Sequence, residues 1–94
     1  MSGGRKMTIT VRLYAGLPEK VRARLAGGLP APSGAGVPLT RELADGTAIS
    51  SLLAELHLET IEVLTMFVNG RARGPEHVLS DGDQIGLFPP IGGG

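Results

Sequence analysis

The most regular feature of the sequence is an alternation of hydrophobic and polar residues, which predicts β-strands with one buried face. In the first such stretch, Ile9, Val11 and Leu13 occupy every second position and share one face. Four strands are predicted in this way, together with a brief strand or turn at 77–79: 8–14, 37–43, 64–69 and 84–88. Pro38 cannot donate a hydrogen bond to a sheet, so its strand is expected at an edge.

A different spacing, with hydrophobic residues three and four positions apart, predicts two helices. The clearer helix covers about 47–56, with Thr47 as a good N-cap and a stripe of four aliphatic residues: Ile49, Leu52, Leu53 and Leu56. A shorter helix is predicted over 17–25, because Pro18 suits a first helical turn and Gly27-Gly28 suits a stop.

The resulting order is β, short α, β, α, β, β, β, which indicates an α+β domain with two layers. We expect a disordered leader over 1–6, a folded domain over 7–90 with a mobile loop at about 26–36, and a flexible glycine tail over 91–94. Little side-chain surface can be buried in the leader, the loop and the tail, whereas ordering them would cost backbone entropy.

Composition then excludes several classes of function. The chain has 94 residues, a formal net charge of zero and no cysteine. No disulfide framework or thiolate metal site is therefore possible, and a nucleic-acid binder is not indicated. No signal peptide and no membrane-spanning run is found, so a cytoplasmic location is expected. His57 and His77 stand alone in the sequence, and no metal site is predicted.

Charge is nonetheless unevenly distributed along the chain. Through Arg24 there is a clear excess of lysine and arginine, whereas acidic residues dominate afterwards. Such an imbalance fits either ordinary solvated faces or a surface that steers a partner protein.

Residues 88–94 have the most distinctive composition. Phe88 closes the last predicted strand, Pro89-Pro90 favour an extended exit, and Gly92-Gly93-Gly94 carry no side chains. Such a tail suits the presentation of a C-terminal carboxylate to the narrow active site of another enzyme. A carboxylate is a poor electrophile until adenylation gives it a leaving group, and sulfide transfer to the acyl adenylate would leave a thiocarboxylate.

On these residues the chain resembles the MoaD/ThiS family of ubiquitin-like sulfur carriers, and within it the small subunit of molybdopterin synthase. The resemblance covers 7–94 and rests on the strand at 8–13 and on three motifs: Phe67-Val68-Asn69-Gly70, Leu79-Ser80-Asp81-Gly82-Asp83-Gln84-Ile85 and Leu87-Phe88-Pro89-Pro90-Ile91-Gly92-Gly93-Gly94. Family members typically end in an aromatic residue, Pro-Pro, an aliphatic residue, a small residue and Gly-Gly. The segment 15–36 is longer than in compact members, and residues 1–6 are additional.

The resemblance implies a ubiquitin-like β-grasp fold, in which one main helix lies across one face of a mixed sheet. The first and last strands should be central, parallel and adjacent, in the order second, first, last, third, with the 77–79 piece at the edge. Residues expected in the core are Ile9, Val11, Leu13, Leu39, Leu43, Ile49, Leu52, Leu53, Leu56, Met66, Val68, Ile85 and Leu87.

The resemblance also implies a chemistry, with Gly94 as the carrier of adenylate and thiocarboxylate. A ubiquitin-activating-type adenylyltransferase would use ATP to activate Gly94, and a sulfur donor would supply the sulfur. The tail would then enter the large subunit of molybdopterin synthase, or an equivalent, and donate sulfur to a pterin precursor of the molybdenum or tungsten cofactor. This tail comprises Pro89, Pro90, Ile91, Gly92 and Gly93. The chain is expected to act as a carrier and not as an enzyme by itself, and to bind no cofactor.

Three alternatives remain open at this point. The sulfur acceptor could instead be a thiazole, a tRNA base or cysteine. The chain could also be a protein modifier that is joined to target lysines through Gly94, or a binding module with an inert tail.

The two phenylalanines provide the candidate partner interface. Alternation places Phe67 and Phe88 on the strand faces opposite the aliphatic residues, so both should point away from the main helix. We expect them to form an exposed apolar patch at the root of the tail. The alternative is that the loop at 26–36 folds over them.

Overall fold

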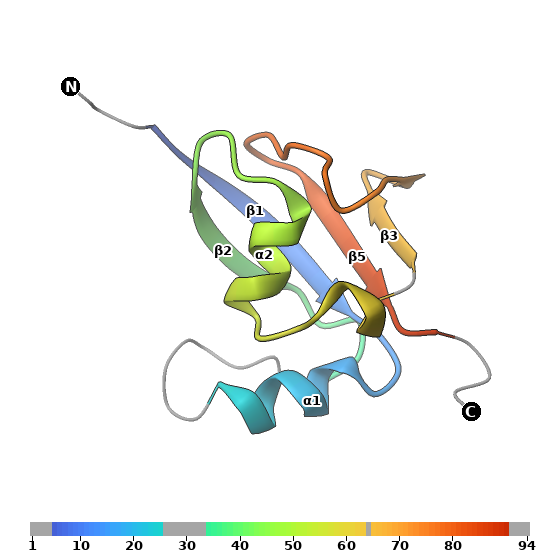
Figure 1. Cartoon of the computed structure of the whole chain (residues 1–94). Coiled ribbons are helices and arrows are strands. Elements are labelled where there is room, and N and C mark those ends of the chain that lie inside the picture. Colours follow the sequence, from blue (N-terminus) through green and yellow to red (C-terminus); the bar gives the residue numbers. More distant parts are fainter. Residues whose placement is uncertain (1–4, 26–33, 64, 91–94) are drawn as a thin grey trace.

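The strong alternation at the start of the chain produces the long strand β1, Lys6–Leu13, which lies inside a five-stranded sheet with a neighbouring strand on each side. The computed structural model describes residues 5–25, 34–63 and 65–90. In chain order after β1, the elements are α1 (Leu17–Arg24), β2 (Leu39–Ala44), α2 (Ile49–Glu55), the 3-10 helix η1 (Thr60–Glu62), β3 (Thr65–Val68), β4 (Arg71–Ala72) and β5 (Gln84–Phe88). The expected α+β fold with a mixed sheet is confirmed (Figure 1).

The sheet has the order β2-β1-β5-β3-β4, with β1 and β5 side by side at its centre. These two strands are parallel, with Val11 opposite Ile85, and the other neighbouring pairs are antiparallel. The predicted order of the second, first, last and third strands is confirmed, and β2 lies at an edge as Pro38 indicated. The prediction for the other edge was wrong, because β4 occupies it and the 77–79 piece does not.

The segment 75–79 instead caps the main helix. The backbone N–H groups of Ile49 and Ser50 donate to the carbonyl oxygens of His77 and Pro75, at 2.9 and 2.8 Å. These bonds satisfy the free N–H groups of the first helical turn, which a side-chain cap would otherwise serve. The N-cap is therefore Ala48 with no side-chain hydrogen bond, and not Thr47, whose hydroxyl donates to the carbonyl of Ala44.

The core lies between the sheet and the two helices and is made of aliphatic side chains with methionine. Every residue predicted to be buried is buried. The structure adds seven further members: Met7, Leu17, Val21, Leu25, Leu58, Val63 and Leu79.

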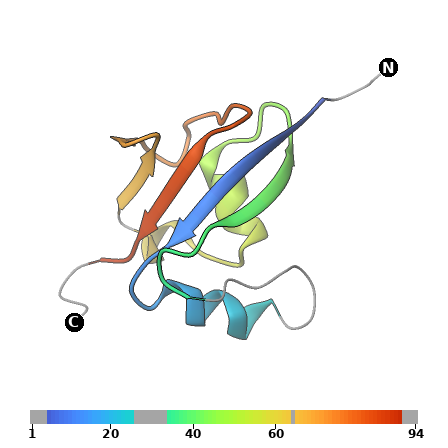
Figure 2. The same cartoon turned by 180° about the vertical axis from the view of Figure 1, so that it is seen from behind.

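The two faces of the sheet are covered differently. Helix α2 lies across one face in Figure 1, and α1 lies at the end of the sheet near the start of β2 and the end of β5. Seen from behind, no described helix crosses the other side of the sheet (Figure 2), which we call the open face. No helix in the described part of the chain is long and apolar enough to cross a membrane.

Several predicted boundaries move by a few residues. β1 includes Lys6, which pairs with Ala44 and therefore does not belong to the leader predicted over 1–6. Of the loop predicted at 26–36, residues 34–36 are described. There the N–H of Gly36 donates to the carbonyl of Leu13 at 2.8 Å, and Gly36 has a positive φ of 74°. The predictions for 1–4, 26–33 and 91–94 concern residues outside those described.

Candidate functional site

Strand β5 ends where the tail begins, and its alternation decides which side chains surround that point. Leu87 points into the core and is fully buried, whereas Phe88 lies on the open face and is half-buried. The antiparallel partner of Phe88 is Thr65 on β3. On the other side the N–H of Tyr14 donates to the carbonyl of Leu87, which extends the β1 pairing by one residue.

Three aromatic side chains meet on the open face beside the tail, and we call them the aromatic cluster: Tyr14, Phe67 and Phe88. The rings of Tyr14 and Phe88 are stacked, with centroids 4.4 Å apart and planes 2° from parallel. Phe67 meets Phe88 edge-on, at 5.7 Å and 88°. Both phenylalanines therefore face away from α2, but their mutual contacts leave them half-buried and not fully exposed.

A shallow recess of about 230 Å³ opens between the aromatic cluster and the middle of β5. Gly86 forms its floor, between Arg12 on β1 and Phe67 on β3. The guanidinium Nη1 of Arg12 donates to the Oε1 of Gln84 at 2.8 Å, which holds the positive charge at the edge of the recess. This part of the surface thus combines apolar rings with one cation.

Of the predicted tail, the structure describes only the first two residues. Pro89 is half-buried and Pro90 is exposed, and neither belongs to a helix or strand. Ile91, Gly92, Gly93 and Gly94 lie outside the described residues. The structure therefore places the root of the predicted site beside the aromatic cluster.

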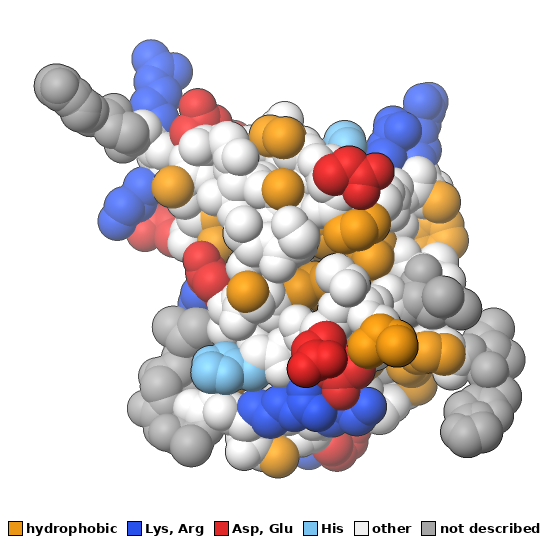
Figure 3. Space-filling model, viewed as in Figure 1, with side chains coloured by type: hydrophobic (Ala, Val, Ile, Leu, Met, Phe, Trp, Pro, Cys, Tyr) orange, Lys and Arg blue, Asp and Glu red, His pale blue; other side chains and the backbone are white. Residues whose placement is uncertain are grey.

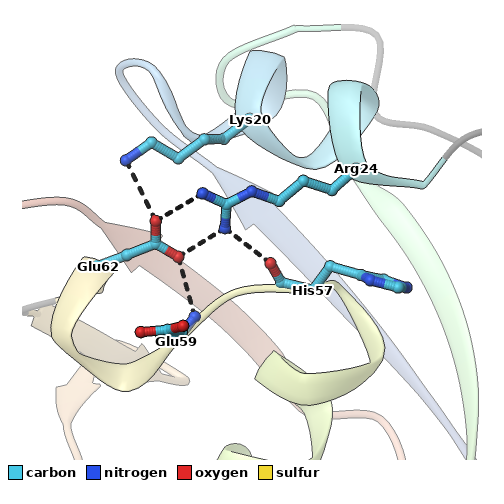
Figure 4. Close-up of polar contacts among 5 residues, drawn as sticks. All are labelled: Lys20, Arg24, His57, Glu59 and Glu62. Carbon is cyan, nitrogen blue, oxygen red and sulfur yellow. Dashed lines mark hydrogen bonds and ion pairs between the residues drawn. The ribbon is translucent and has the colours of Figure 1, made fainter.

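The uneven charge of the sequence is partly neutralised by ion pairs between distant segments. Arg24 on α1 binds Glu62 on η1 through two hydrogen bonds of 2.7 and 2.8 Å, and Lys20 lies 3.5 Å from the same carboxylate (Figure 4). Arg24 also donates to the carbonyl of His57. On the helix side of the molecule, blue and red side chains meet over α1 and η1 (Figure 3). These basic residues thus serve the contact between α1 and η1.

The same contacts shift the titration of both partners. Hydrogen bonds from Arg24, and then from the backbone N–H of Glu59, lower the pKa of Glu62 from 4.5 to about 2. The hydrogen bond with Glu62 raises the pKa of Arg24 above its usual value. Both groups are therefore charged at neutral pH, and the cluster has the properties of a structural clamp.

Neither histidine lines the recess beside the aromatic cluster. His57 follows Leu56, the C-cap of α2, and His77 lies in the segment that caps the start of that helix. Within the described ranges, no three acidic, histidine or cysteine side chains are grouped so that they could hold a metal ion.

Residues 34–94 match the model of the ThiS family, and this match spans more than half of the sequence. The chain belongs to the ThiS family. The matched region includes the aromatic residues of β3 and β5 and the whole glycine tail, and the resemblance to the MoaD/ThiS family is confirmed. No protein of curated function matches the chain in sequence.

Solved structures share the fold of this ThiS-family chain. The HVO 2177 protein of Haloferax volcanii has a TM-score of 0.67 at 22% identity, and the alignment covers 99% of this chain and 100% of that one. Small archaeal modifier protein 1 of the same organism has a TM-score of 0.63 at 16% identity, covering 90% and 99%. A protein assigned as molybdopterin converting factor subunit 1 from Pyrococcus furiosus has a TM-score of 0.61 at 20% identity, covering 90% and 99%. The likeness establishes the ubiquitin-like β-grasp fold.

Three residues of the surface were not singled out from the sequence: Arg12, Tyr14 and Gly86. Alternation along β1 did place Arg12 and Tyr14 on the outward face. Their proximity to Phe88 depends on the parallel pairing of β1 with β5, in which Arg12 lies opposite Gly86, 74 positions further along the sequence. Gly86 gives no hydrophobic signal at all, and its role is visible only once its neighbours on both sides are known.

Proposed function

We propose that this ThiS-family chain carries sulfur on Gly94 for the synthesis of a molybdenum- or tungsten-pterin cofactor. The observation that supports the proposal most is the continuity between β5 and the tail. The central strand runs directly into Pro89-Pro90, and the glycine-rich residues that follow have no side chains to obstruct entry into an enzyme. The half-buried aromatic cluster beside the exit would give that enzyme a surface to bind.

The chemistry would take place in two steps at the carboxylate of Gly94. The carboxylate would attack the α-phosphate of ATP, releasing pyrophosphate and forming an acyl adenylate. Hydrosulfide, or its equivalent from a sulfur donor, would then attack the acyl carbon, and AMP would leave. The adenylyltransferase would bind ATP, so this chain would need to supply only the carboxylate, the extended tail and the docking surface.

The pterin acceptor is supported by two features. Phe88-Pro89-Pro90 is part of the motif in which the chain resembles the small subunit of molybdopterin synthase. One protein of the same fold is assigned as a molybdopterin converting factor subunit. In this role the thiocarboxylate would enter the large synthase subunit and donate its sulfur to a pterin precursor. Other members of the fold are named modifier proteins, so conjugation to lysine is the competing outcome that the experiment must distinguish.

The deciding experiment is intact mass spectrometry of the protein after incubation with the ATP-dependent activating enzyme of the same organism, ATP and sulfide. We expect a mass increase equal to the exchange of one oxygen for one sulfur, located on Gly94 by fragmentation. Deletion of Gly94, or addition of one residue after it, should abolish the exchange. Gly93→Ala should reduce it, because the tail must fit a narrow channel.

Gly92→Ala is the matched control, since a small residue is expected at that position and the exchange should be nearly normal. Conjugates of high mass would support a protein modifier instead. An unchanged mass for the wild-type chain, or a full exchange in the variant with an added residue, would contradict the proposal.

A further inference from the structure

The recess on the open face exists because β5 has no side chain at Gly86. The pairing register places Gly86 between Arg12 and Phe67, and Phe88 follows two residues later on the same face. Gly86 is half-buried by these neighbours although it has no side chain of its own. The recess is therefore the space that a side chain at position 86 would otherwise occupy.

The backbone does not require glycine at this position. Gly86 is not among the glycines with positive φ, and an alanine Cβ there would lie 3.6 Å from Phe88 Cε1 and 3.7 Å from Tyr14 Cε2. Both distances are ordinary van der Waals contacts. Glycine inside a strand is less stabilising than alanine, and it often marks a place where another molecule approaches closely. Gly86 thus carries a stability cost that the fold itself does not explain.

The rim of the recess offers one uncompensated charge. Arg12 uses Nη1 to bind the side-chain oxygen of Gln84, and no carboxylate of the described residues lies within ion-pair distance of it. A guanidinium has five N–H donors in a fixed planar arrangement, so donors remain for an incoming carboxylate.

From these observations we infer that the partner which activates the tail inserts one aliphatic side chain over Gly86 and pairs a neighbouring carboxylate with Arg12. This inference rests on the proposed function and names the contact that would recognise the chain. The rings of Tyr14, Phe67 and Phe88 supply apolar walls, and Arg12 supplies the matching charge.

A second copy of the same face could not provide the inserted group. The described strands place threonine, alanine, aromatic and charged or amide side chains on the open face, and their larger aliphatic residues point into the core. The side chain that occupies the recess must therefore come from a surface other than the open face of this protein. The recess begins two residues before the end of β5, so an enzyme that holds the tail would lie directly over it.

The test measures KM and kcat of the activating enzyme of the same organism, by pyrophosphate release at varied concentrations of the carrier. Gly86→Ala should raise KM about tenfold with kcat unchanged, because a methyl group removes space that the partner uses in ground state and transition state alike. Gly86→Val should raise KM further. Arg12→Gln should raise KM at low salt, and this difference should shrink at high salt.

Gly16→Ala is the matched control, since a Cβ there meets nothing within 4 Å and φ is −85°. Its KM should equal that of the wild type. The thermal midpoint of Gly86→Ala should equal or exceed that of the wild type, which separates lost docking from misfolding.

A wild-type KM in both Gly86 variants would overturn the inference and leave the proposed function intact, because the tail would still be activated. An effect of the Gly86 variants on kcat alone, with KM unchanged, would also overturn the inference and leave the proposed function intact. A wild-type chain that the enzyme does not activate would overturn the proposed function, and the assignment of the recess with it.

Discussion

The two faces of the sheet are made from the same strands but from different kinds of side chain. The face under α2 is lined by aliphatic residues and methionine, whereas all three aromatic residues of the sequence lie on the open face. Leu87 and Phe88 make the contrast clearest, because they are neighbours on β5 and face opposite ways. The covered face accounts for the stability of the fold, and the open face holds large apolar groups that the core does not need.

The largest effect is expected from Leu87→Ala. Leu87 is fully buried on the central strand, so its truncation leaves a cavity between the sheet and the helices. We expect the free energy of unfolding to fall by about 2–5 kcal/mol. Urea denaturation followed by circular dichroism measures this loss. A decrease no greater than that of Phe88→Ala would remove the distinction between the faces.

Phe88→Ala should weaken binding to the partner more than it lowers the stability of the fold. The loss of its contacts with Tyr14 and Phe67 should lower the free energy of unfolding by only about 1 kcal/mol. Loss of a central aromatic anchor should weaken binding to the activating enzyme by about 2–4 kcal/mol. Isothermal titration calorimetry gives the affinity, with the Leu87→Ala protein compared at a temperature where it is folded. Unchanged affinity would exclude the aromatic cluster from the interface.

The next prediction concerns the ion pair between Arg24 and Glu62, which joins α1 to η1. The pKa of Glu62 is lowered to about 2, so its contribution to stability is present above pH 4.5 and is lost as the pH falls toward 2. We expect the thermal midpoint of the wild type to fall more steeply over this range than that of Glu62→Gln. Because other carboxylates titrate in both proteins, the informative quantity is the difference between the two profiles. Parallel profiles would show that the clamp adds no stability.

The smallest effect is expected at the end of α2. His57 has a positive φ of 60°, and the N–H groups of His57 and Leu58 donate to the carbonyls of Ala54 and Leu53, which is the hydrogen-bond pattern of a Schellman motif. Glycine adopts this conformation without strain, so His57→Gly should raise the free energy of unfolding by about 0.5 kcal/mol.

Asn69 is the matched comparison for His57, with a similar φ of 53° but a side chain that is in use. It accepts a hydrogen bond from the N–H of Gln84 and donates one to Asp83. Asn69→Gly should therefore destabilise the protein, and thermal unfolding of both variants tests the pair. Equal shifts would mean that backbone conformation alone decides both positions.

Much of this architecture could be predicted because period-two alternation determines which face of a strand is buried. The strands β1 and β5 follow directly from that rule, and the stripe on α2 follows from the spacing of three and four positions that is typical of a helix. The edge strand β4 was missed because Arg71-Ala72 has no hydrophobic pattern, although the sequence Asn69-Gly70 is typical of a hairpin turn. Thr47 was misassigned as the N-cap because the carbonyls that cap α2 come from residues 75–77, which no local rule could identify.

The candidate site was predictable to a different extent. Phe67 and Phe88 were found from alternation, since an aromatic residue on the polar face of a strand is conspicuous. The stacking of Tyr14 on Phe88 and the recess over Gly86 arise from three strands coming together, so they could not be found in any one segment. The sequence indicated where to expect recognition, but the shape of the surface depends on how the strands are arranged in the sheet.

The central position of β5 has a consequence for biosynthesis. β1 is translated early, yet its parallel partners in β5 lie 74 residues further along the chain, as Val11 and Ile85 do. Without β5 the sheet would separate into the pairs β2-β1 and β3-β4. Contacts of such long range form late in folding. On the ribosome, the nascent chain cannot complete its core until β5 has emerged, and the same strand bears the tail. A truncated or stalled chain would therefore lack both the finished core and the tail that the proposed function requires.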